Sequence, residues 1–450
     1  MKPVVLLLVF AQALLLDAVA DRPTAPVPVV PASAVAPADL QKLAANAEKE
    51  LRGNILPFWL EHARDREHGG FHAFIGEDMK VRDDEPRGAL LTSRILWTFS
   101  AAYRKYPDPA YLEMARWAYR DLTDNFIDKE KGGLFWTITS DGKPLDAHKQ
   151  IYVQVFGLYA LSEFFRATGE QPALDQAVAI YRLIEQHASD PKAGGYFDSL
   201  DRAWQPEKGT AGNLLGAAPK SQNSHIHILE GYSNLLRVWP DAGLRERQRA
   251  LIELMLTRII APRTHHLVLF MQNDWTPIGE EISYGHDIEL SWLLVEAAQV
   301  LGDPALLART KAEAVAIAQV TNAEGIDRDG GVFSEGDPKG LTNPNKEWWE
   351  QAEAAVGFFN AYQISGDPRF FAYARRSWDF IQAKLVDRKN GDWYNTLTRD
   401  CTPILTVTTP KGRVIPSAKL SIWKCPYHNS RCCLELIERI EELTKSEAAH

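Results

Sequence analysis

The segment Asp128-Lys129-Glu130-Lys131-Gly132-Gly133-Leu134-Phe135-Trp136 has a charged start, a pair of glycines and an apolar end. Similar segments recur along the chain, and their first glycines are Gly69, Gly194, Gly330 and Gly391. The spacing is about sixty residues and doubles between Gly194 and Gly330, so a weakened copy is expected near Thr264 to Phe270. Such a period is typical of a fold built from repeated units.

A second marker recurs between the glycine segments, a proline in a polar turn. These prolines are Pro37, Pro109, Pro172, Pro240, Pro304 and Pro368. A polar side chain can cap free N–H groups, and proline has no N–H to lose, so each marks a helix start. A more apolar helix is expected after each glycine segment, over Leu90 to Tyr103, Ile151 to Phe165, Ile226 to Trp239, Ile288 to Leu301, Trp348 to Tyr362 and Arg431 to Leu443.

The repeating unit is therefore an amphipathic helix, a glycine turn and an apolar helix, six times over. A helix that is apolar nearly all round must be buried, whereas one with a polar face can lie outside. Six such units predict an all-α fold, a closed (α/α)6 barrel, with short β-hairpins at the glycine turns. An open solenoid is the alternative.

The first twenty residues have the pattern of an export signal. Lys2 gives a positive start, Val4 to Leu16 is apolar apart from Gln12, and Ala18-Val19-Ala20 fits a cleavage site. This run is short for a membrane span. We therefore expect a signal peptide (1–20), a Pro/Ala-rich linker (21–37) and one catalytic domain (38–450). The mature protein is expected to be exported, periplasmic or secreted, monomeric and not inserted in a membrane.

Charge and cysteines limit the partners. The net charge is −9 without a basic block, so nothing supports nucleic-acid binding. The cysteines are Cys401, Cys425, Cys432 and Cys433. An exported protein could pair two of them, for example Cys401 with Cys432 or Cys433. Their spacing does not match a zinc site, and no metal is expected.

Polar residues gather where the apolar helices begin, and in a barrel those ends meet at one mouth. They are Arg94, His148, Gln150, Tyr152, Asn223, His225, His227, Glu230, His286, Glu289, Glu347, Trp348, Trp349, Glu350, Glu353, Trp423 and His428. A single histidine is more often structural than catalytic. Several at equivalent positions, beside tryptophan and arginine, favour a functional site.

Two or more histidines without a metal suit acid–base chemistry near neutral pH. Two rings on facing helices could remove a proton next to a carbonyl and return it from the other side. Arg94 could stabilise the enediolate oxygen, and tryptophan faces could hold a sugar. His286 and Glu289 lie three apart on one helix face, so the carboxylate is expected to orient the ring.

Several of these stretches resemble the cellobiose 2-epimerases of the N-acylglucosamine 2-epimerase superfamily, from about Leu40 to the last helix. They are Ser93 to Arg104, Ser224 to Glu230, Ser283 to Glu289, Lys346 to Ala354 and Trp423 to Asn429. The resemblance implies an (α/α)6 barrel that epimerises C2 of the reducing-end glucose of cellobiose or a related β-1,4-linked disaccharide. It implies a small-molecule sugar as the partner and no cofactor.

The resemblance also implies roles. His286 and His428 would be the C2 acid–base pair, His227 would assist ring opening, and Glu289 would tune the neighbouring histidine. Arg94 would bind oxygens near C1 and C2. The remaining substrate-binding residues would be Tyr152, Asn223, Trp348, Trp349, Glu353 and Trp423.

The sequence departs from the family pattern at Thr92, Gly231 and Cys401, and Thr402 to Lys419 is longer than usual. Three other functions remain open. They are a mannose-type aldose–ketose isomerase with the same histidine pair, a glycoside hydrolase using two carboxylates, and a non-catalytic sugar-binding protein.

Overall fold

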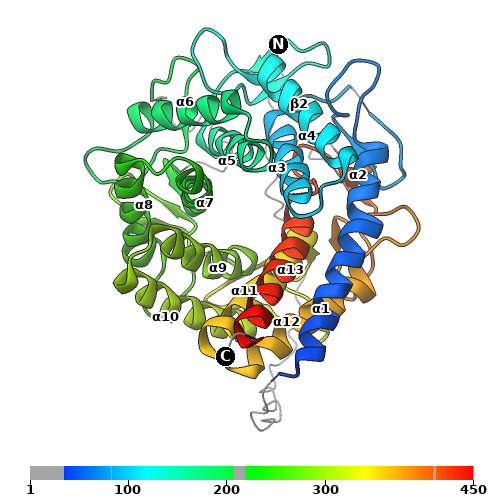
Figure 1. The fold of residues 1–450 in the computed structure, drawn as a ribbon, viewed down its shortest axis with the longest axis vertical. Coiled ribbons are helices and arrows are strands. Elements are labelled where there is room, and N and C mark those ends of the chain that lie inside the picture. The colour runs from blue at the N-terminus through cyan, green and yellow to red at the C-terminus, as the bar shows by residue number, and fades with distance from the viewer. Residues whose placement is uncertain (1–34, 83, 207–217, 409–411, 449–450) are drawn as a thin grey trace.

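The computed structural model describes residues 35–82, 84–206, 218–408 and 412–448, and it shows a closed ring of helices (Figure 1). The predicted export signal lies outside these residues, as does most of the predicted linker. Within them, no helix combines the length and apolar character needed to cross a membrane.

Six helices of the described chain line the inside of the ring. They are α3 (Ala89–Lys105), α5 (Ile151–Thr168), α7 (Gln222–Val238), α9 (Tyr284–Leu301), α11 (Trp348–Ser365) and α13 (Tyr427–Ala448). Each contacts the next, and α13 contacts α3. The ring is therefore closed and the fold is an (α/α)6 barrel, as predicted, rather than an open solenoid.

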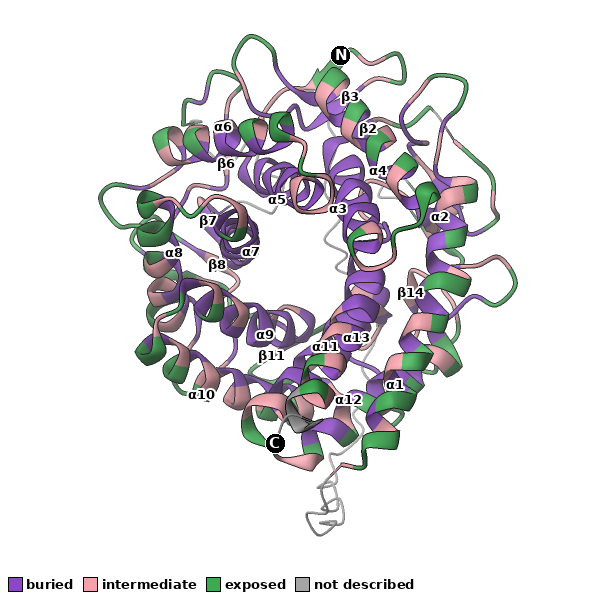
Figure 2. Cartoon of the chain, viewed as in Figure 1, coloured by how far each residue is buried: buried purple, intermediate pink, exposed green. Residues whose placement is uncertain are grey.

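The outer layer consists of α1 (Pro37–Glu50) with α2 (Leu56–His62), α4 (Pro109–Asp121), α6 (Gln171–His187), α8 (Ala242–Leu254), α10 (Pro304–Val320) and α12 (Pro368–Phe380). A five-residue π-helical turn follows α1, α4, α8, α10 and α12, at η1 (Leu51–Ile55), η2 (Leu122–Phe126), η3 (Met255–Ile259), η4 (Thr321–Gly325) and η5 (Ile381–Leu385). Figure 2 shows why the layers differ: the inner helices are buried nearly all round, whereas the outer ones are exposed along one side.

The glycine turns form six equivalent antiparallel bridges, Arg64–Phe71, Ile127–Leu134, Ser189–Tyr196, Ile260–Leu267, Ile326–Val332 and Val386–Trp393. The fourth is the predicted weakened copy. There His265 has φ +61°, in the left-handed region that glycines occupy in the other units. A non-glycine residue in that conformation explains why the glycine pattern fades in this unit.

Short strands hold the starts of the inner helices. Those directly before an inner helix are β2 (Arg87–Gly88), β5 (Lys149–Gln150), β7 (Lys220–Ser221), β10 (Ile282–Ser283) and β13 (Lys346–Glu347). Each pairs with the hairpin of the following unit, at β3 (Thr137–Ile138), β6 (Ser199–Leu200), β8 (Phe270–Met271), β11 (Glu335–Asp337) and β14 (Thr396–Leu397). In the last unit β17 (Ala418–Leu420) pairs with β1 (Ile75–Gly76), which joins the two ends of the ring.

The remaining strands extend these hairpins or form one of their own: β4 (Pro144–Asp146), β9 (Pro277–Ile278), β12 (Gly340–Asn343), β15 (Thr406–Thr408) and β16 (Val414–Pro416). Buried lysines also lie at these joints. Lys149 and Lys220 stand two residues before an inner helix and pair with Asp128 and Asp190 of the glycine turns. Each buried lysine therefore has a partner of opposite charge.

Two predictions were wrong. Three inner helices begin four residues before the predicted start, at Gln222, Tyr284 and Tyr427, because polar residues taken as preceding the helix form its first turn. The four cysteines are all free. Cys432 and Cys433 are buried within α13, whereas the Cys401 thiol donates to Asp329, with Sγ 3.0 Å from Oδ2.

Candidate active site

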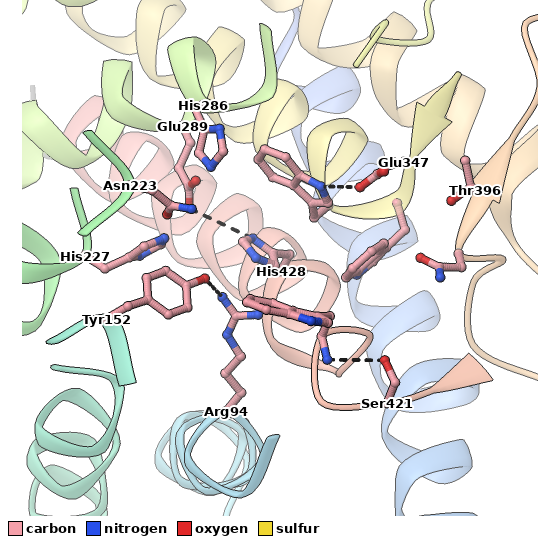
Figure 3. A pocket seen from close by; sticks show the side chains of 14 residues that line it. Arg94, Tyr152, Asn223, His227, His286, Glu289, Glu347, Thr396, Ser421 and His428 are labelled. Atoms are coloured by element: carbon pink, nitrogen blue, oxygen red, sulfur yellow. Dashed lines mark hydrogen bonds and ion pairs between the residues drawn. The ribbon is translucent and has the colours of Figure 1, made fainter. Parts of the chain in front are cut away.

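A cavity of about 380 Å³ lies where the inner helices begin (Figure 3). Its lining residues come from every inner helix and from two of the joints between units. They are Arg94, Tyr152, Asn223, His227, His286, Glu289, Glu347, Trp348, Trp349, Asn395, Thr396, Ser421, Trp423 and His428.

His227 and His428 are held in the same way. The Nδ1 of His227 lies 2.9 Å from Oε2 of Glu230, one turn further along α7. The Nδ1 of His428 lies 2.7 Å from Oε1 of Glu353 on the neighbouring α11. A carboxylate accepts, so Nδ1 carries the proton in each neutral ring and Nε2 is left as the basic atom.

The surroundings keep these rings neutral. Burial lowers the pKa of His227 and lowers that of His428 well below its ordinary value, and the positive charges of Arg94 and Arg431 act in the same direction. A neutral imidazole with a free Nε2 is the form that can accept a proton from carbon.

His286 is held differently from the predicted arrangement. Its Nδ1 lies 2.7 Å from the Ser283 hydroxyl, and burial lowers its pKa to about 3. Glu289 does not orient this ring, because its Oε1 accepts a hydrogen bond from Arg431 of α13 at 2.7 Å. Its other oxygen is buried without a hydrogen-bond partner. Burial, with Glu353 nearby, raises the pKa of Glu289 to about 8.

Arg94 brings a positive charge to the cavity. Its Nη2 donates to the Tyr152 hydroxyl at 2.6 Å, and its Nη1 lies 3.7 Å from Sγ of Cys425. The guanidinium carbon lies 4.3 Å from the centre of the Phe156 ring. Within the described chain no carboxylate forms an ion pair with Arg94, although its side chain is almost fully buried. Buried charges are normally paired, so this one is available to an anion in the cavity.

Indole rings form much of the wall. Trp349 lies between two histidines, with its ring centre 4.7 Å from that of His286 and 5.7 Å from that of His428. Its Nε1 donates to Glu347 at 2.8 Å, which fixes the indole plane. Trp423 lies beside Tyr152, at 6.3 Å between ring centres. Flat apolar faces of this kind can bind the C–H faces of sugar rings.

The structure brings together every predicted catalytic residue and every predicted substrate-binding residue except one. Glu353 does not line the cavity, because it lies behind His428 and hydrogen-bonds that ring, Arg431 and the Trp292 indole. Two other histidines at the mouth are engaged elsewhere: His225 accepts from the Tyr196 amide, and His148 lies 2.5 Å from Asp146.

Sequence reasoning missed Arg431, Asn395, Thr396 and Ser421. Arg431 left a weak signal, since it is an isolated charge between Ser430 and two cysteines in a helix predicted to be apolar. The other three left none, because they are ordinary polar residues of the last hairpin and of the segment before α13. One side-chain oxygen or nitrogen atom from each of Glu289, Glu353 and His428 lies within 4.8 Å of the others. The guanidinium of Arg431 is the positive charge that pairs with both Glu289 and Glu353.

Comparison with known proteins identifies the family. Residues 69–415 match the family model of N-acylglucosamine 2-epimerase (GlcNAc 2-epimerase). The chain belongs to the N-acylglucosamine 2-epimerase family. It is 41% identical over 396 residues to a cellobiose 2-epimerase of Bacteroides fragilis, which covers 87% of this chain and 97% of that protein. This family member is therefore a sugar 2-epimerase, an isomerase.

Solved structures agree. The cellobiose 2-epimerase from Bacillus thermoamylovorans B4167 matches with a TM-score of 0.81 and 36% identity, over 89% of this chain and 100% of that one. A D-mannose isomerase matches with a TM-score of 0.76 at 21% identity, over 89% of this chain and 97% of that one. At that identity the second match shows the shared fold alone.

Proposed function

We propose that the protein inverts C2 of the reducing-end glucose of cellobiose or a related β-1,4-linked disaccharide, through an enediolate and without a cofactor. The observation that carries the proposal is Arg94, a buried cation that faces the cavity and pairs with no carboxylate among the residues that the structure describes. An enediolate oxygen would supply the missing negative charge, and it exists only along the reaction path. Arg94 would therefore stabilise the intermediate more than the neutral sugar.

The proton transfers fall to the histidines. In the open-chain sugar, Nε2 of one ring of the pair His286 and His428 takes the C2 proton, and the C1 carbonyl oxygen becomes the enediolate oxygen beside Arg94. After rotation about C2–C3, the other ring donates a proton to the opposite face of C2. That ring is neutral in the resting site, and it takes this proton from water once the negative enediolate has formed beside it. The first ring is then left protonated and returns its proton to water. His227, with its Nε2 on the cavity side, would assist ring opening.

The rest of the cavity suits a second sugar. Besides the histidines, Arg94, Glu289 and Glu347, the wall consists of uncharged polar groups and indoles, including Asn395, Thr396, Ser421, Trp348 and Trp423. Hydroxyl-rich ligands are recognised by such a mixture of hydrogen-bonding groups and flat apolar faces. The names of the related enzymes support cellobiose as the first substrate to test.

The test is incubation of the protein with cellobiose in deuterated water, followed by NMR at C2. We expect glucosyl-mannose carrying deuterium at C2. His286→Gln and His428→Gln should each lose the exchange, whereas His148→Gln, at a histidine outside the cavity, should keep it. The same assay distinguishes the alternative functions. With mannose as the substrate, a ketose product without any 2-epimer would indicate the isomerase instead of the epimerase. With cellobiose, release of glucose would indicate a hydrolase.

A further inference from the structure

One guanidinium lies at the centre of the carboxylates behind the cavity. Nη1 of Arg431 donates to Glu230, and Nη2 donates to Glu353 at 2.6 Å and to Glu289 at 2.7 Å. Its side chain is 1% exposed, and it comes from α13, whereas the three carboxylates come from α7, α9 and α11. Arg431 is therefore the common partner of three helices.

Two of these carboxylates are the same groups that hold the histidines. Glu230 bonds Nδ1 of His227 through Oε2 and Arg431 through Oε1. Glu353 bonds Nδ1 of His428 and Arg431 through the same oxygen, Oε1. A continuous path of hydrogen bonds therefore runs from one ring to the other through a single cation.

We infer that Arg431 is a positioning residue that shares its guanidinium between Glu230 and Glu353, so that His227 and His428 keep the same tautomer and the protonation of each ring depends on that of the other. A carboxylate that already pairs with a guanidinium attracts a second proton-bearing cation less strongly. Both rings then stay neutral, with Nε2 free on the cavity side. Without Arg431, each carboxylate would hold the imidazolium form of its own ring.

The surrounding charges are consistent with this role. The titratable and charged groups around Arg431 and the two rings are Arg94 on α3, Tyr152 and Tyr159 on α5, Glu230 on α7, His286 and Glu289 on α9, Glu353 on α11, and Tyr427 and Cys432 on α13. Of the three carboxylates that Arg431 bonds, Glu230 and Glu353 are the two that also hydrogen-bond a histidine ring. Burial opposes ionisation of Glu230, but Arg431 lowers its pKa below the ordinary value.

Arg439 provides a matched control. It lies two turns further along α13, and both guanidinium groups lie over the Trp292 ring, at 4.7 Å for Arg431 and 5.5 Å for Arg439. Arg439 pairs with Glu435 and with amide groups instead of the carboxylates that hold the histidines. Changing it alters the charge and packing of α13 but not the path between the rings.

The experiment is an NMR titration of the histidine rings in Arg431→Met, in the absence of sugar. We expect the pKa values of His227 and His428 to rise together by about one unit or more, as loss of a nearby cation predicts. The ring of His225, which bonds the backbone of Tyr196 and Ser221 instead of a carboxylate beside Arg431, serves as an internal reference. Arg439→Met should move neither ring. If the pKa of neither ring rises in Arg431→Met, or if only one of them rises, the inference is overturned.

If Arg431→Met does not fold, Arg431→Lys provides a second test. A single ammonium cannot reach both carboxylates as the guanidinium does, so the pKa of at least one ring should rise. Unchanged titration of both rings in that variant would also overturn the inference. The assignment of chemistry to these rings rests on the proposed function, but the titration needs no substrate. Loss of coupling and absence of epimerisation are therefore separate results.

Discussion

Replacing Arg94 with methionine should separate activity from stability. The guanidinium is buried against Phe156 and the Tyr152 hydroxyl, and no carboxylate of the described chain pairs with it. If an enediolate oxygen forms at about 4 Å from this charge, Coulomb's law with an effective dielectric constant of about 20 gives about 4 kcal/mol. Each 1.36 kcal/mol is about a factor of ten, so kcat should fall about a thousandfold.

Arg94→Met should not destabilise the fold, although removal of a buried arginine usually does. Removal of one partner of a buried pair destabilises by about 3–5 kcal/mol, because it leaves an unpaired charge. Arg94→Met leaves none and retains an apolar side chain beside Phe156. We therefore expect its free energy of unfolding to be unchanged or higher.

Two measurements test this reasoning. Deuterium exchange at C2 of cellobiose gives kcat and KM, and urea unfolding gives the stability. The expected pattern is a large loss of kcat, little change in KM, and no loss of stability. A variant that loses stability along with activity would show that Arg94 supports the fold. A variant with a raised KM and an unchanged kcat would show that it binds the ground-state sugar rather than an intermediate.

Two further predictions concern stability. Burial lowers the pKa of His286 to about 3, whereas in the unfolded chain it is about 6.5. Between these pH values the unfolded state binds more protons than the folded state. The contribution of His286 to the free energy of unfolding is therefore full above pH about 6.5 and is lost on acidification. His286→Gln should therefore reduce the slope of unfolding free energy against pH between 6 and 4, by up to about 1.4 kcal/mol per pH unit; an unchanged slope in urea titrations would contradict the low pKa. A Cβ on Gly357 would lie 2.7 Å from the Ile288 carbonyl oxygen, so Gly357→Ala should force α9 and α11 apart and cost about 1–3 kcal/mol. Gly53→Ala, where nothing lies within 4 Å, should stabilise by about 0.4–1 kcal/mol, and equal thermal shifts for the two variants would refute the contact argument.

The barrel was predictable because its signals are local. A glycine with positive φ and a proline at a helix start are required by backbone geometry within a few residues, and the ring repeats both. The weakened fourth unit was predictable for the same reason, since the spacing of its neighbours left room for one more turn. His265 replaces the glycine there, at the cost of a left-handed conformation.

The partners of the site residues were not predictable, because they depend on the distant Arg431. Spacing by three pairs His227 with Glu230 within α7, as expected for one helix face. The same spacing fails for His286 and Glu289, because Glu289 is drawn to a guanidinium 142 residues away in the sequence. Nothing in the local sequence distinguishes the two cases.

With the helix starts corrected, the repeat explains which polar residues of the inner helices face the cavity, apart from His286, the third residue of α9. The second residues of four inner helices are Tyr152, Asn223, Trp349 and His428, and the sixth residues of four are Arg94, His227, Glu289 and Glu353. Positions two and six are one turn apart and share a face. All of these residues line the cavity except Glu353, which holds a ring that does.

The fourth residue points the other way, because two residues turn a helix by about 200°. There Gln154, His225, Asp287 and Gln351 each accept a hydrogen bond from a backbone amide of the glycine turn. His225 is therefore structural, and His227, two residues later, faces the sugar cavity. An error of four residues in the helix start was enough to hide this distinction, which the sequence otherwise contains.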